Sequence, residues 1–163
     1  MCIRDSLNTD IFYNYEYAFY DSHLVSEFEK FKSHYIRFST KPFDFLNIQA
    51  GLGTGNEIAY REEIPELGDR FSFNTSIEVT LNNNLRIKPS VNFSKLKKLD
   101  SQEYFFDGYI ARFDIRYQFT SSLNLRVISE YNEFSDQFFV QPLISWRPNS
   151  DTIFYLGGNQ NYI

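Results

Sequence analysis

The sequence predicts an all-β fold, an antiparallel up-and-down meander of about nine long strands. Apolar and polar residues alternate with a period of two through most of the chain, as they do in strands with one apolar and one polar face. Aromatic residues, which favour strands, make up 19 % of the 163 residues. Short polar segments typical of turns separate the alternating runs.

The central hairpin joins residues 70–81 to residues 85–93. Odd positions in both segments are apolar residues, Thr or Pro, and even positions are polar. The three asparagines at 82–84 tolerate left-handed backbone and are predicted to form the turn. One register then satisfies both faces of the hairpin. It pairs Leu81 with Leu85, Val79 with Ile87 and Phe73 with Phe93, and it places Glu78 opposite Lys88.

The C-terminal half repeats this design with two further hairpins. One joins 109–119 to 123–132 through the turn 120–122, and the other joins 138–146 to 153–157 through the turn 147–151. The first register sets Arg112 opposite Glu130 and Asp114 diagonal to Arg126. It also sets Arg116 opposite Arg126, a pair of like charges that neighbouring acids have to screen.

Two parts of the chain depart from the simple pattern. Alternation is weaker toward the N-terminus, where 11–19, 28–40 and 44–54 are predicted strands and 20–30 also fits a short helix. Pro89 and Pro142 lie inside predicted strands. Because proline lacks a backbone N–H, a bulge or a locally irregular ladder is expected at both.

Composition excludes several classes of protein. The net charge of −5 leaves no overall basic footprint, so nucleic acid is not an expected partner. No run of about 18 apolar residues is present, which excludes a membrane-spanning helix. Cys2 is the only cysteine, so no internal disulfide forms.

No constellation of an enzyme or a cofactor site is found. The glycines at 51, 53 and 55 lack the spacing of a dinucleotide fingerprint, and their expected role is to soften a strand end. His23 and His34 have no second ligand at a metal spacing. The acidic segment with Glu62, Glu63, Glu66 and Asp69 fits either a solvated loop or a weak cation site. We therefore expect no enzymatic activity, no cofactor and no metal.

Strand length and connection length favour a membrane barrel. The turns 82–84, 120–122 and 147–151 are short, whereas the links 55–68, 96–104 and 132–136 are longer, which is the pattern of bacterial outer-membrane barrels. The predicted location is the outer membrane of a Gram-negative bacterium, with lipid as the partner of the apolar face. A soluble β-sandwich or a lipocalin-like module that binds a small apolar ligand or a protein shows the same periodicity and stays an alternative.

Two groups of residues are candidate functional positions. Charged residues of the polar face would line the interior of a barrel, either as a stabilising ion-pair network or as the lining of a pore. Aromatic residues near strand ends would lie at the membrane interfaces. The charged group is Glu78, Arg86, Lys88, Arg112, Asp114, Arg116, Arg126 and Glu130, and the aromatic group is Tyr104, Tyr109, Phe119, Tyr131, Phe138 and Trp146.

The C-terminal part of the chain resembles a known family. The run RFDIRYQFTSSLNLRVISEYN at 112–132 and the run LISWRPNSDTIFYLGG at 143–158 are similar to the C-terminal barrel, of unknown function, in Gram-negative outer-membrane proteins. Leu85-Arg86-Ile87-Lys88-Pro89 resembles an earlier strand of that barrel. Asn149 stands where the family has glycine. Residues 7–68 match only in general strand character.

The resemblance implies a barrel joined to an N-terminal carbohydrate-binding module similar to family 9. Carbohydrate is then a partner through that module, which is not among these residues. The opening Met-Cys-Ile-Arg-Asp-Ser at 1–6 looks like a translated sequencing adapter. We expect residues 7–163 to be a barrel domain that is incomplete at both ends, because the final strand of the family is missing after Ile163.

Overall fold

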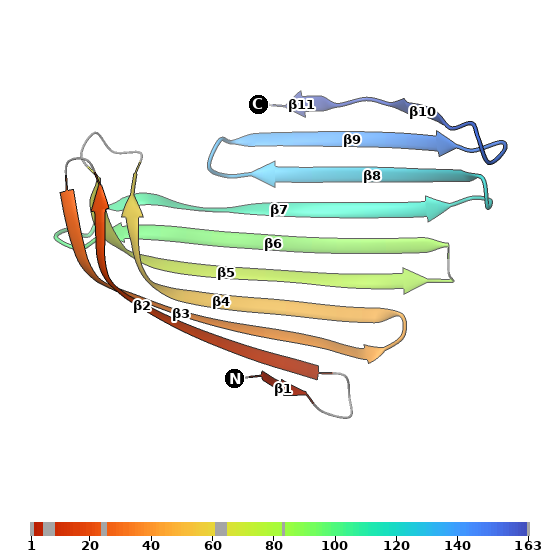
Figure 1. The fold of residues 1–163 in the computed structure, drawn as a ribbon. Coiled ribbons are helices and arrows are strands. Elements are labelled where there is room, and N and C mark those ends of the chain that lie inside the picture. The colour runs from red at the N-terminus through yellow and green to blue at the C-terminus, as the bar shows by residue number, and fades with distance from the viewer. Residues whose placement is uncertain (1, 5–8, 24–25, 61–64, 83, 163) are drawn as a thin grey trace.

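The computed structural model describes residues 2–4, 9–23, 26–60, 65–82 and 84–162. These residues form a single antiparallel sheet in which neighbouring strands follow the order of the chain (Figure 1). None of the described residues is helical. Within this part of the chain, no helix is long and apolar enough to cross a membrane. The strands are β1 (Cys2–Arg4), β2 (Thr9–His23), β3 (Ser26–Phe43), β4 (Leu46–Ala59), β5 (Glu66–Leu81), β6 (Leu85–Lys98), β7 (Tyr104–Gln118), β8 (Leu123–Asn132), β9 (Gln137–Trp146), β10 (Phe154–Gly157) and β11 (Gln160–Tyr162).

The predicted all-β antiparallel meander is confirmed. Eight of the nine predicted strands are β2–β9, and β10 with β11 makes the ninth, because both pair with β9 in one continuous register. β1 is additional and pairs with Asp10–Phe12 of β2, although it lies in the segment 1–6 that was set apart from the domain. Residues 1, 5 and 6 of that segment lie outside the described residues.

Both prolines interrupt a ladder on one side without shifting its register. The ladder between β5 and β6 continues to Ser76–Ser90 and resumes at Val79–Ile87, so the gap includes Pro89. The register of the pairs on either side of this gap places Glu78 opposite Lys88. At Pro142 the carbonyl still accepts a bond from the Gly158 N–H at 3.2 Å. The second hydrogen bond of this pair would need a backbone N–H at position 142, which proline lacks. The partner strand is interrupted at this point and divides into β10 and β11.

The cross-strand register agrees with the sequence pattern. The pairs Leu81–Leu85, Val79–Ile87 and Phe73–Phe93 are observed in the central hairpin. The next hairpin pairs Arg112 with Glu130 and Arg116 with Arg126, and Asp114 is diagonal to Arg126. Asn82 has a φ of 51° in the 82–84 turn, the left-handed backbone for which asparagine is suited.

The prediction that 55–68 is a long loop is wrong. β4 continues to Ala59 and β5 starts at Glu66. Polar pairs hold this extension together: Asn56 donates to Asp69 at 2.9 Å, and the Arg70 guanidinium lies 3.2 Å from the Glu57 carboxylate. Because both faces of this ribbon carry polar residues, its sequence does not alternate between apolar and polar residues.

The helical alternative for 20–30 is also wrong for the described residues. β2 continues to His23, and β3 starts at Ser26. At the other links, strands extend into the predicted loops, so that β6 continues to Lys98 and β7 starts at Tyr104. The contrast between short turns and long loops is therefore weaker than expected. The segment 99–103 lies at one end of the sheet, and 119–122 and 147–153 lie at the other (Figure 1).

The described residues contain very little packed core. Among the residues whose side chains the structure describes, only four hydrophobic side chains are buried, and large apolar residues of most strands are exposed. Three of the four, Ala59, Leu96 and Ile128, share the face of the sheet that carries the charged residues, which we call the polar face. The opposite face carries the odd-numbered residues of β5–β7 and is called the apolar face. The sheet is also curved, with β2–β4 bending at one end (Figure 1). The polar face therefore carries most of the little core that the described residues have.

Candidate functional site

The predicted charged residues lie together in transverse rows on the polar face. The row nearest the 82–84 turn places Arg86 opposite Arg116, and Arg116 opposite Arg126, across β6, β7 and β8. We call these three residues the arginine row. The next row places Lys88 opposite Asp114, and a third places Arg112 opposite Glu130. All eight predicted charged residues belong to this patch, with Glu78 in β5 at its edge.

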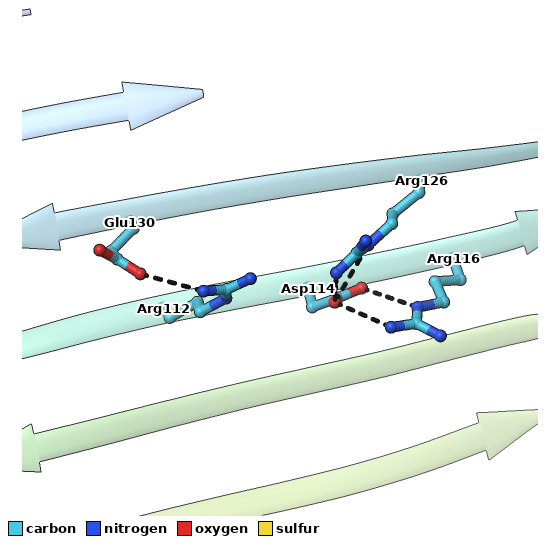
Figure 2. Close-up of polar contacts among 5 residues, drawn as sticks. All are labelled: Arg112, Asp114, Arg116, Arg126 and Glu130. Carbon is cyan, nitrogen blue, oxygen red and sulfur yellow. Dashed lines mark hydrogen bonds and ion pairs between the residues drawn. The ribbon is translucent and has the colours of Figure 1, made fainter. Parts of the chain in front are cut away.

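Asp114 is the centre of the patch (Figure 2). Its carboxylate accepts bonds from Arg116 at 3.2 and 3.3 Å and from Arg126 at 3.3 and 3.1 Å. The Asp114 side chain is only 13 % exposed, whereas Arg116 is 52 % exposed. One carboxylate therefore bridges two guanidinium groups from residues that the register sets directly opposite each other. Such charge-assisted bonds are stronger than neutral ones, and they offset part of the repulsion between the two arginines.

Two further ion pairs surround this centre. Arg112 donates to Glu130 at 3.3 Å across β7 and β8 (Figure 2). Arg86 lies 3.7 Å from Glu78, a looser contact between a half-exposed arginine and a partly buried glutamate. Lys88 faces Asp114 in the register but forms no ion pair with any described residue. The patch thus combines five cationic residues with three acidic ones.

Ile128 is a member of the patch that the sequence pattern missed. It lies opposite Asp114 in β8 and is 4 % exposed. The alternation slips here, because apolar Ile128 is on the polar face and Ser129 on the apolar one. This break in the alternation is visible in the sequence and is the signal that could have identified Ile128. Apolar surroundings strengthen nearby ion pairs by excluding water.

A second feature of the polar face is a groove floored by glycine. A side chain at Gly51 would place its Cβ 2.5 Å from the Tyr35 hydroxyl, and one at Gly53 would place it 2.6 Å from the Ser72 hydroxyl. Asn74 donates to the Tyr35 hydroxyl at 3.3 Å. The glycines therefore allow Tyr35 to lie over β4, beside a cavity of about 480 Å³. This close approach is the role expected of glycine in a strand.

The apolar face forms a band of limited height. In β5 it extends from Phe71 to Leu81, and along β7 from Tyr109 to Phe119, the residue that follows the strand. At about 3.3 Å per residue this is about 33 Å of strand. Beyond the band the same face carries mostly polar residues, together with the apolar pair Ile58–Leu67. The polar residues are Asn56, Asp69, Lys95, Lys97 and Asp107. Thr75 lies within the band, and its hydroxyl donates to the Gln49 carbonyl at 3.1 Å.

Aromatic rings line both edges of this band. At the edge next to the polar extension, Tyr109 contacts Tyr131 at 5.9 Å between ring centroids, and Phe138 contacts Tyr162 at 6.1 Å. At the turn edge, Phe119 packs against Tyr117 at 4.7 Å and Trp146 against Phe154 at 5.5 Å. Of the six predicted aromatic residues, Tyr104 lies outside these edges. Tyr104 lies beyond the edge that is next to the polar extension, and the Lys95 ammonium is 5.8 Å from the Tyr104 ring.

The histidines and the acidic segment singled out in the sequence form no metal site among the described residues. His34 shares a hydrogen bond with the Tyr13 hydroxyl at 2.8 Å. Glu62 and Glu63 lie outside the described residues. The described part of the chain contains no group of three or more His, Cys, Asp or Glu that is arranged to hold a metal ion. No protein-family model, curated protein or solved structure matches this chain.

Proposed function

We propose that this chain is part of an outer-membrane β-barrel of a Gram-negative bacterium. Its apolar face lies against lipid, and its polar face lines the interior of the barrel. The role is that of a membrane wall that anchors or serves a periplasmic carbohydrate-binding domain, as the family resemblance implies, and that passes solutes through its interior. The role involves no enzymatic chemistry.

The single observation that supports this proposal is the bounded apolar band. At the tilt of about 40° that strands have in outer-membrane barrels, about 33 Å of strand spans about 25 Å, which is the height of the lipid-facing band that aromatic girdles flank on both sides. Apolar side chains within the band are exposed, among them Phe73, Ile77 and Phe113 at 38–40 %. An exposed apolar surface this large calls for a partner, and its two aromatic edges fit lipid better than a second sheet.

Cell fractionation combined with a gel-mobility assay tests the proposal. The full-length protein that contains this chain is expressed in a Gram-negative host, and membrane samples are run with and without boiling. We expect it in the outer-membrane fraction, with a mobility shift on boiling, because a closed barrel resists detergent until it is heated. A soluble periplasmic product with no shift would contradict the proposal and favour the binding module with an apolar ligand.

A further inference from the structure

We propose that the arginine row forms a binding site for small anionic solutes that carry a carboxylate or phosphate group. This inference deepens the proposed function by naming the solute class that the polar face selects. Three arginines of three adjacent strands lie in one row at one end of the polar face, two of them paired with Asp114 and the third with Glu78. Rings of Arg and Lys are the devices by which pores select anions.

The arrangement of the row is costly for folding. Like charges directly opposite each other destabilise a sheet, and the row contains two such pairs in succession. The acids nearby do not remove the excess, because Asp114 is shared by Arg116 and Arg126, and Glu78 reaches only Arg86. Three arginines therefore share two acids, Asp114 and Glu78, and the row keeps a net positive charge that its ion pairs do not cancel.

The row also borders a cavity of suitable size and chemistry. A cavity of about 360 Å³ is lined by the three arginines. This is within the range of small-molecule sites, which is roughly 300–1,000 Å³. The neutral donors and acceptors Thr80, Asn84, Gln118 and Asn124 also line this cavity. Hydroxyl and amide groups next to guanidinium groups suit a solute that has an anionic group and neutral polar groups.

The guanidinium groups remain available to such a solute. Arg116 is 52 % exposed and Arg86 is 50 % exposed, although each already has a carboxylate partner. A guanidinium has five N–H donors, and Arg116 uses Nε and one terminal nitrogen for Asp114. The remaining donors match the two oxygens of a carboxylate or a phosphate, which arginine binds in a bidentate manner.

Calorimetric titration of the folded full-length protein tests the inference. The probes are inorganic phosphate, glucuronate and uncharged glucose. We expect phosphate or glucuronate to bind and glucose to bind at least about tenfold more weakly, because only the anions form charge-assisted bonds. Arg116→Gln and Arg86→Gln are each expected to weaken anion binding about tenfold, and Arg116→Lys, which keeps the charge, to weaken it less.

Arg37→Gln is the matched control. Arg37 is on the same face in β3, with its guanidinium 5.5 Å from the Tyr35 ring, and it does not line the cavity at the arginine row. This variant should bind the anions as the parent does. Equal loss in Arg37→Gln and Arg116→Gln, or no anion binding by a protein that shows the mobility shift, would overturn the inference and leave the barrel standing. The absence of the mobility shift contradicts the barrel itself, whatever the titration shows.

Discussion

Ile115→Arg should lower the free energy of unfolding by about 2–4 kcal/mol when the protein is in lipid. Ile115 lies near the middle of the apolar band, between Ile87 and Val127 on the neighbouring strands. At this depth an arginine has no water to solvate its charge and has to reach the interface or draw water inward. Guanidinium unfolding followed by the fluorescence of Trp146, the single tryptophan, measures the change.

Asn56→Arg is the control for depth. Asn56 belongs to the same face but lies beyond the band, opposite Asp69 in β5. An arginine at this position stays in water next to a carboxylate, so a change within about 0.5 kcal/mol is expected. Equal effects of Ile115→Arg and Asn56→Arg would show that the band does not lie against lipid.

Asp114→Asn should destabilise the protein by about 1–3 kcal/mol, because each of the two arginines loses its charge-assisted partner. Arg116 and Arg126 then face each other with no carboxylate between them. The repulsion also predicts how a second substitution acts. Arg116→Leu should cost less in the Asp114→Asn background than in the parent, because it then removes a like-charge contact.

A double-mutant cycle with these two substitutions measures the interaction. We expect a coupling energy of about 0.5–3 kcal/mol between positions 114 and 116, the range for residues in one ion-pair network. Additive effects would mean that the observed bonds contribute nothing to stability. Arg112→Leu is a control on the same strand, because its partner is Glu130 and not Asp114. Its effect should add to that of Asp114→Asn with little coupling.

Period-two alternation explains why the hairpins were predictable. With a turn of known length, alternation leaves only one register in which both faces agree, and the pairs Arg112–Glu130 and Arg116–Arg126 followed directly from it. The ion pairs of Asp114 with both arginines were implied by the same register. The candidate charged patch was therefore accessible from the sequence before any coordinates.

The features that sequence reasoning missed have different physical causes. In the ribbon formed by 55–59 and 66–69, the neighbouring apolar residues Ile58 and Ala59 lie on opposite faces and both are buried, so alternation is lost. Ile128 breaks the pattern because it is a buried apolar residue on the polar face. The cavity at the arginine row depends on three strands at once, and no single hairpin contains it.

Lipid quenching along β7 tests most directly whether the apolar face lies against lipid. Cys2 is replaced by serine, and single cysteines placed at positions 111–116 carry a fluorescent label in the full-length protein in vesicles with nitroxide lipids. We predict strong quenching at 111, 113 and 115 and weak quenching at 112, 114 and 116, because successive side chains of a strand point to opposite faces. Equal quenching at odd and even positions, or none at any position, would contradict a barrel wall with lipid on one side.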